Sequence, residues 1–237
     1  MWMDISGHTI VITGGSKGIG LAIAEACAAA GANVAITGRD ERALAAAERT
    51  LAAHGRGVIA SRTDVRDHAG VAAFIDGVAE TFGGLDVLVN NAGVGAFAPV
   101  GEMSLEDWHR VIDTNLNGVF YCTRAALPHL RKSRHAYVIN ISSLAGKNWF
   151  AGGAAYCASK AGLNAFSEAL MQDVRQHDIR VSYIMPGSVN TEFNFMGAKP
   201  ADWKLTGADI AQVVLDLVAS DRRALASRVE IRPSKPR

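Results

Sequence analysis

The 237-residue sequence is poor in cysteine and proline, and it has almost no excess charge of either sign. Its three cysteines, Cys27, Cys122 and Cys157, form no C-x-x-C pair and lack the cysteine–histidine spacing of a metal site. We therefore expect buried, reduced thiols and no metal ligands. The 6 prolines leave room for long uninterrupted helices, and the 24 glycines suit many strand-to-helix turns.

The charge is nearly balanced, with 24 basic and 23 acidic residues and a formal net charge of +1. This balance argues against partners such as nucleic acid or a membrane surface. Residues 1–7 lack the basic start and apolar run of a signal peptide, and no apolar stretch approaches the length of a membrane span. We expect a cytoplasmic protein that binds neither nucleic acid nor membrane.

Apolar, β-branched runs alternate with helical stretches along the chain, within a composition that is 49% hydrophobic. Strands are expected at residues 9–13, 34–37, 58–61, 85–90, 137–141 and 180–185, and helices at 18–30, from Asp40 onward, through Phe74 and Val78, and at 105–114, 118–132 and 154–177. Apolar strands separated by helices are typical of a parallel sheet covered on both faces. The sequence therefore predicts one doubly wound α/β domain over residues 1–237, interrupted only by an irregular insertion at 192–206 that would cover the substrate.

The first expected strand ends in a glycine-rich turn, Thr13-Gly14-Gly15-Ser16-Lys17-Gly18-Ile19-Gly20, with the pattern T-G-x-x-x-G-x-G. Glycines at these positions let the backbone turn sharply and approach a pyrophosphate, whose charge the following helix N-terminus stabilises. A glycine cluster alone is weak evidence, because tight turns also need glycine. Placed between the first strand and the first helix of an alternating chain, it indicates a Rossmann-type dinucleotide-binding fold.

Four motifs in this order resemble the short-chain dehydrogenase/reductase family, in its compact single-domain branch of carbonyl and 3-oxoacyl reductases. They are the glycine-rich turn, Asn90-Asn91-Ala92-Gly93, a serine ahead of Tyr156-Cys157-Ala158-Ser159-Lys160, and Pro186-Gly187. The resemblance extends from Gly7 to about Ala219. It implies hydride transfer between a nicotinamide cofactor and a carbonyl or alcohol.

Tyr156 and Lys160 are four positions apart, so on a helix they share one face. An ammonium about 5 Å from the phenol would lower the tyrosine pKa by roughly two units and make it a useful general acid and base. The resemblance implies that Tyr156 exchanges a proton with the substrate oxygen and that Lys160 also binds the nicotinamide ribose. It further implies that Ser143 donates a hydrogen bond to the substrate oxygen.

The resemblance also assigns Asn115 to holding a water in the proton relay. Each of Ser143 and Asn115 has a neighbouring residue of the same type that could take its role. Ser142 is adjacent to Ser143, although Ser143 has the family's spacing to the tyrosine, and Asn117 lies two residues after Asn115.

The sequence favours NADP(H) over NAD(H). Gly38 occupies the position at the end of the second strand where NAD-specific sites carry a ribose-binding acid. Arg39 and Lys17 provide two cations that would pair with a 2′-phosphate. Asp40, 20 residues after Gly20, could instead serve as the ribose acid, but its position suits a helix N-cap better.

The resemblance implies further contacts with the cofactor along the chain. The expected set is Gly14, Ser16, Lys17, Gly18, Ile19, Gly20, Arg39, Asp64, Val65, Asn91, Ala92, Gly93, Tyr156, Lys160, Pro186, Gly187, Val189 and Thr191. An apolar, partly aromatic substrate pocket is expected from Val94, Leu144, Trp149, Phe150, Phe193, Phe195 and Met196, with Phe97 as a further candidate. Lys147 is a possible anion anchor, but a surface lysine is the preferred interpretation.

The sequence therefore predicts an NADPH-dependent reductase of a small ketone or aldehyde, or the reverse alcohol oxidation. Alternatives are a 3-oxoacyl-thioester reductase, an NAD-dependent secondary alcohol dehydrogenase and, from another class, a non-catalytic NADP-sensing protein. The C-terminus departs from the family, because residues 228–237 form a short strand and a basic, proline-broken tail. A homodimer or homotetramer is expected, with the tetramer in doubt for this reason.

Overall fold

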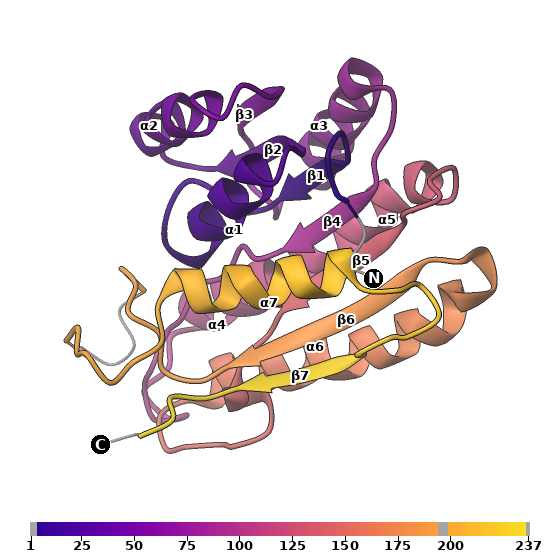
Figure 1. Ribbon diagram of the computed structural model, residues 1–237. Helices are drawn as coiled ribbons and strands as arrows, with labels where there is room; N and C mark the ends of the chain where they lie inside the picture. The colour runs from indigo at the N-terminus through magenta and orange to yellow at the C-terminus, as the bar shows by residue number, and fades with distance from the viewer. Residues whose placement is uncertain (1–3, 194–198, 236–237) are drawn as a thin grey trace.

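The computed structural model describes residues 4–193 and 199–235, and its centre is one parallel sheet of seven strands (Figure 1). The sheet order is β3-β2-β1-β4-β5-β6-β7, and every neighbouring pair is parallel. The strands are β1 (Thr9–Ile12), β2 (Asn33–Gly38), β3 (Val58–Arg62), β4 (Val87–Asn90), β5 (Tyr137–Ile141), β6 (Arg180–Pro186) and β7 (Arg228–Ile231). The predicted parallel α/β architecture is confirmed.

Helices cover both faces of the sheet, because neighbouring residues of each buried strand point to opposite sides. Ile10 and Ile12 of β1 pack in the core formed with α1 (Gly18–Ala29), α2 (Glu41–Ala52) and α7 (Gly207–Ala219). Val11, between them, packs in the second core with α3 (His68–Phe82), α5 (Gly118–Leu130) and α6 (Ala154–Val174). The short helix α4 (Leu105–Ile112) completes the set.

Several element boundaries differ from the sequence-based expectation. The helix expected at 105–114 ends at Ile112 and continues as a π-helical turn, Asp113–Asn117, before α5. The helix expected at 154–177 ends at Val174, and its last residues form a 3-10 turn, Arg175–His177. The fourth strand begins at Val87 rather than at residue 85. Element ends depend on local hydrogen bonding that apolar periodicity does not report.

Helix α7 was not predicted, although its N-terminal signal is present in the sequence. Thr206 and Asp209 form a capping box, in which the Asp209 N–H donates to Thr206 Oγ1 at 3.4 Å and the Thr206 N–H donates to Asp209 Oδ2 at 2.7 Å. The apolar face of the helix, including Ile210 and Val214, packs in the same core as α1. The cap therefore fixes where the irregular insertion ends and regular structure resumes.

The three thiols, Cys27, Cys122 and Cys157, are buried and free, as expected. Burial raises the pKa of Cys27 and of Cys122 to about 12. Within residues 4–193 and 199–235, no three histidine, cysteine or acidic side chains gather closely enough to hold a metal ion. In the same part of the chain, no helix has both the length and the apolar character needed to span a bilayer.

The capping box yields a stability prediction. Thr206→Ala removes the hydroxyl that accepts from the first turn of α7, so the free energy of unfolding should fall by about 1 kcal/mol, measured by urea denaturation. Thr50→Ala is the matched control, because the exposed Thr50 hydroxyl donates to the Ala46 carbonyl of its own helix, and its effect should stay within about 0.5 kcal/mol. Equal losses in the two variants would show that the cap contributes nothing specific.

Candidate active site

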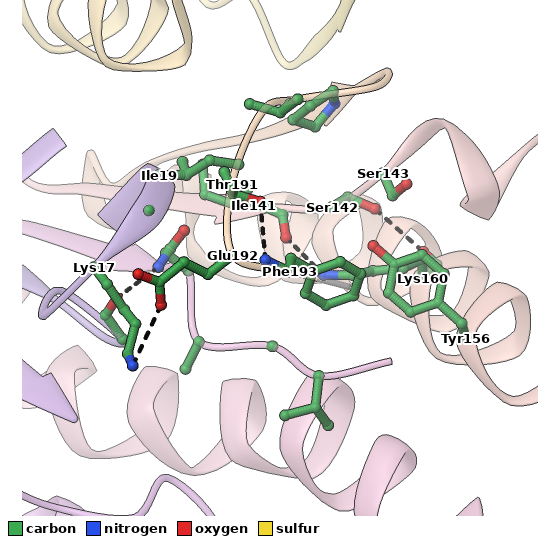
Figure 2. Close-up of a pocket in the computed structure, with 18 of the residues that line it drawn as sticks. Lys17, Ile19, Ile141, Ser142, Ser143, Tyr156, Lys160, Thr191, Glu192 and Phe193 are labelled. Atoms are coloured by element: carbon green, nitrogen blue, oxygen red, sulfur yellow. Dashed lines mark hydrogen bonds and ion pairs between the residues drawn. The ribbon is translucent and has the colours of Figure 1, made fainter. Parts of the chain in front are cut away.

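A cleft of about 1000 Å³ runs along the carboxyl ends of the strands, at the edge where open parallel sheets bind ligands. It is lined by the segments that follow β1 to β6 and by two residues that follow β7. Its volume is at the upper end of the range for ligand pockets, which suits a dinucleotide together with a small substrate. Figure 2 shows Lys17 at one end of this cleft and Ser143, Tyr156 and Lys160 at the other.

The glycine-rich turn begins the cleft. Gly14 and Gly18 have φ angles of +64° and +58°, in the left-handed region that favours glycine. Gly20 serves a different purpose, because a Cβ there would lie 2.2 Å from the Gly14 carbonyl oxygen. It is packed beneath the turn and is not among the residues that line the cleft, so its predicted contact with the cofactor is replaced by a packing contact.

The turn is tied to the segment after β4. The Thr13 Oγ1 accepts hydrogen bonds from the backbone N–H groups of Asn91 and Ala92, both at 3.0 Å. The Asn91 side-chain amide donates back to the carbonyls of Thr13 and Gly14, at 2.9 and 3.1 Å. These bonds bring Asn91, Ala92 and Gly93 to the wall of the cleft, where the sequence predicted them.

The two cations predicted to select NADP(H), Lys17 and Arg39, both line the cleft. Lys17 Nζ lies 3.6 Å from Asp40 Oδ2. It also lies 3.5 Å from Glu192 Oε2 (Figure 2). All three side chains are at least half exposed, so each pair is weak. Glu192, which no sequence motif indicated, has a carboxylate that would compete with a 2′-phosphate for Lys17.

Asp40 caps helix α2, as the preferred interpretation of the sequence held. Its Oδ1 accepts from the N–H groups of Arg42 and Ala43, both at 3.1 Å. These backbone hydrogen bonds and the Lys17 ammonium lower the pKa of Asp40.

Asp64 and Val65, which follow the neighbouring strand β3, also line the cleft, as predicted. Asp64 Oδ2 lies 2.6 Å from Arg66 Nη2, and this pairing lowers the pKa of the Asp64 carboxyl.

Helix α6 carries Tyr156 and Lys160 on one face into the cleft, where both are buried, with 8% and 4% of their surface exposed. Lys160 Nζ donates to the Ile141 carbonyl at the end of β5, at 2.9 Å, and lies 5.9 Å from the centre of the Tyr156 ring (Figure 2). The predicted pairing of the two side chains across one turn of helix is therefore present.

The prediction that Lys160 lowers the pKa of Tyr156 is wrong for this structure. Burial raises the pKa of the Tyr156 hydroxyl to about 12, and the hydrogen bond with Ser143 only partly opposes it. Burial also lowers the pKa of Lys160 to about 8, because removal from water disfavours the charged ammonium. At neutral pH the tyrosine is protonated and the site holds a proton donor.

Of the two adjacent serines, the structure favours Ser143 as the partner of Tyr156. Ser143 Oγ accepts from the Ala145 N–H at 3.1 Å, at the start of the 3-10 turn Leu144–Gly146, and it is hydrogen-bonded to Tyr156. Ser142 Oγ instead donates to Asn164 Oδ1 at 2.5 Å and is buried against α6. The hydroxyl of Ser142 therefore helps to fix the end of β5 on the helix.

Asn115 is fully buried in the π-helical turn, behind the cleft wall. Its Oδ1 accepts from the Val94 N–H at 2.8 Å, and its amide donates to the Val94 carbonyl at 2.9 Å and to Ser159 Oγ at 3.0 Å. The alternative, Asn117, bonds to Asp113 within its own turn. Asn115 thus links the segment after β4 to α6, and its water-holding role stays a prediction.

Four of the predicted substrate-pocket residues line the cleft: Val94, Leu144, Phe150 and Phe193. Two aromatic rings lie beside the Tyr156 phenol, with the centres of Phe97 and Phe193 each 5.7 Å from that of Tyr156. Pro186, Gly187, Val189 and Thr191, predicted to hold the cofactor, also line the cleft.

Trp149 was wrongly placed in the pocket. Its side chain is 76% exposed and lines a separate hollow with Val100 and Ala161. The chain turns after Gly146, so Trp149 comes to the outside while Phe150 reaches the cleft. The other two predicted pocket residues, Phe195 and Met196, lie outside the residues that the structure describes.

Other residues at the cleft were not found from the sequence. They include Trp203 and Lys204 from the end of the insertion and Arg232 and Pro233 from the C-terminal tail. Because β7 runs parallel to β6, its carboxyl end reaches the same edge of the sheet as the predicted catalytic residues. A short strand in the sequence does not indicate its direction or its neighbour.

Comparison with known proteins gives a consistent set of relatives. Residues 8–199 match the family described as short chain dehydrogenase. The chain is 37% identical over 190 residues to 3-oxoacyl-[acyl-carrier-protein] reductase FabG of Escherichia coli, covering 80% of this chain and 77% of the relative. It is 39% identical over 199 residues to glucose 1-dehydrogenase 2 of Bacillus subtilis, covering 82% and 76%. A crystal structure of a metagenomic short-chain oxidoreductase in complex with NADP superposes with a TM-score of 0.87 at 39% identity, covering 98% of this chain and 100% of that one.

The buried Lys160 ammonium makes stability depend on pH. Burial lowers its pKa from 10.5 to about 8, so the unfolded chain holds the proton more tightly, and the full destabilisation is present below pH 8. As pH rises from 8 towards 10.5, Lys160 loses its proton in the folded protein, and the free energy of unfolding of the unaltered protein increases. The free energy of unfolding of Lys160→Met, minus that of the unaltered protein, should therefore fall by roughly 3 kcal/mol across this window in urea titrations. Lys132→Met, at an exposed lysine, should show a constant difference, and a constant difference for Lys160→Met too would refute the buried charge.

Proposed function

The chain belongs to the short chain dehydrogenase family, and from this we propose that it is an NADPH-dependent reductase of small ketones or aldehydes, able to run the reverse alcohol oxidation. The proposal rests on the residues that line one cleft. Its glycine turn and cations lie at one end, and Ser143 lies with the buried Tyr156 and Lys160 at the other. Such an arrangement suits an oxidoreductase acting on CH–OH and C=O groups.

NADP(H) fits the cofactor end of the cleft. The left-handed Gly14 and Gly18 allow close approach of a pyrophosphate, and the N-terminus of α1 stabilises its charge. Lys17 and Arg39 supply the cations for a 2′-phosphate, and the metagenomic relative was crystallised with NADP. When bound, NADP(H) supplies or accepts the hydride. Tyr156 and Lys160, beside Pro186 and Gly187, would flank the nicotinamide.

Tyr156 is protonated at neutral pH and can therefore serve as the proton donor that carbonyl reduction requires. With a pKa of about 12 the phenol carries its proton, and it can donate that proton to a substrate oxygen as the carbonyl becomes an alcohol. Ser143, hydrogen-bonded to Tyr156, would hold the same oxygen. The Lys160 ammonium behind the ring would stabilise the phenolate that the donation leaves.

The side chains around Tyr156 indicate which substrates the cleft suits. Phe150, Phe193, Val94 and Leu144 enclose an apolar, partly aromatic space beside the phenol. A modest ketone or aldehyde suits this space, and a 3-oxoacyl thioester is the second candidate because of the 37% identity to the Escherichia coli reductase. NAD-dependent alcohol oxidation and a purely NADP-sensing role remain as outcomes of the tests below.

The first test is reduction itself. Initial rates of NADPH oxidation, followed by absorbance, should rise with some members of a panel of small ketones, aldehydes and 3-oxoacyl thioesters. Tyr156→Phe removes the proton donor, so kcat should fall by roughly 10²- to 10⁴-fold. Tyr121→Phe, on α5 and outside the cleft, should retain its rate. Silence with every carbonyl, together with measurable NADPH binding, would favour alcohol oxidation or sensing and contradict the reductase.

The second test concerns the choice of cofactor. Lys17→Gln and Arg39→Gln should each raise KM for NADPH by about tenfold while leaving that for NADH nearly unchanged, because each removes a charge-assisted bond to the 2′-phosphate. Arg56→Gln, which removes an exposed cation that does not line the cleft, should alter neither constant. A native preference for NADH would show that the two cations do not select the cofactor.

A further inference from the structure

The C-terminal tail enters the substrate end of the cleft. The Gly187 N–H donates to the Ile231 carbonyl at 2.8 Å, which holds the end of β7 against the segment after β6. A Cβ on Gly187 would lie 3.1 Å from Pro233 Cδ and 3.3 Å from Leu144 Cδ1, so these three residues meet at one point. Leu144 follows the catalytic Ser143. Arg232 and Pro233 are therefore wall residues on the side where the carbonyl reacts.

Arg232 brings net positive charge to this wall. Glu230 Oε2 accepts from Arg232 Nη2 at 3.0 Å, while its Oε1 accepts from Lys147 Nζ at 2.6 Å. The two cations hold the pKa of Glu230 below its usual range, so the carboxylate is ionised. One negative charge shared between two positive charges leaves the group of three with a net charge of +1.

The acidic side chains that line the cleft belong to its other end. Asp40 and Glu192 lie within 3.6 and 3.5 Å of Lys17, and Asp64 is paired with Arg66. Figure 2 shows Glu192 directed towards Lys17 and away from Ser143. An anion bound near Arg232 would thus meet the net positive charge without facing these carboxylates at close range.

We propose that Arg232 forms an anion subsite at the substrate end of the cleft, so that the preferred substrates are carbonyl compounds carrying a carboxylate, or the corresponding hydroxy acids. This inference rests on the proposed reductase activity, and it narrows the substrate class. A guanidinium binds a carboxylate through paired N–H donors, which fixes orientation as well as adding affinity. Leu144 and Pro233, which line the same cleft and meet at Gly187, are apolar and suit a short hydrocarbon spacer between carboxylate and carbonyl.

The test compares keto acids with their neutral esters. With NADPH, kcat/KM is measured for 4-oxopentanoate, 5-oxohexanoate and 6-oxoheptanoate and for the three methyl esters. For at least one chain length, the acid should be preferred over its ester by about tenfold. Arg232→Gln should bring that ratio close to one, because it removes the charge that distinguishes acid from ester.

Two further variants separate this subsite from a general effect of charge. Glu230→Gln should raise the acid-to-ester ratio severalfold, since it removes the carboxylate that competes for Arg232. Lys235→Gln removes a cation from the same tail outside the cleft and should leave the ratio unchanged. A ratio that falls equally in Lys235→Gln and Arg232→Gln would overturn the subsite in favour of diffuse attraction by the tail.

The outcomes distinguish the inference from the proposed function. Reduction of esters and acids at equal kcat/KM overturns the anion subsite and leaves the reductase intact. Reduction of neither class, while other carbonyls of the first panel are reduced, also overturns the subsite. If no carbonyl of either panel is reduced, the reductase is overturned, and calorimetric titration of 5-oxohexanoate into the protein with NADP⁺ then decides the subsite. Binding that Arg232→Gln weakens about tenfold supports it, and binding that is absent or unaffected by the substitution overturns it.

Discussion

The hydrogen bonds between Thr13 and the segment after β4 fix the geometry on which the cleft depends. They span β1 and β4, the pair at which the sheet order reverses and the connections diverge to opposite faces. A crevice arises at such a point because the two strand ends are not covered by a shared crossover. The hydrogen bonds between Thr13 and Asn91 tie the glycine turn to the segment that contains Val94. Asn115 then ties Val94 to helix α6, so the turn and the helix are held at a set distance.

Burial of ionisable side chains at the Tyr156 end of the cleft lowers the stability of the folded protein. Lys160 and Tyr156 are both buried, and in each the burial disfavours the charged form. The Ile141 carbonyl compensates the ammonium in part with one hydrogen bond. In the proposed reaction the substrate oxygen would receive the tyrosine proton, and the resulting phenolate would offer Lys160 an opposite charge at short range. The desolvation cost of the buried cation would then be offset in part by that negative charge.

Much of the fold was predictable, because apolar periodicity and glycine placement are local signals. The parallel sheet, the cradle from Gly14 to Ile19 and the sharing of one helix face by Tyr156 and Lys160 follow from spacing alone. Burial is not local, so the pKa of Tyr156 was misjudged from its distance to one neighbour. The positions of Trp149 and Arg232 depend on how a loop turns and on which strand β7 joins, and neither is encoded within a few residues.

The burial of the cysteines has a practical consequence for studying the molecule. With a pKa of about 12, the Cys27 and Cys122 thiols ionise to on the order of one part in 10⁵ at pH 7, and only the thiolate reacts with alkylating probes. Cys157 is also buried, but it lines the hollow beside Trp149. A cysteine introduced at an exposed position would react far faster than Cys27 and Cys122. These two thiols therefore need no replacement before a fluorescent or spin label is attached beside the cleft.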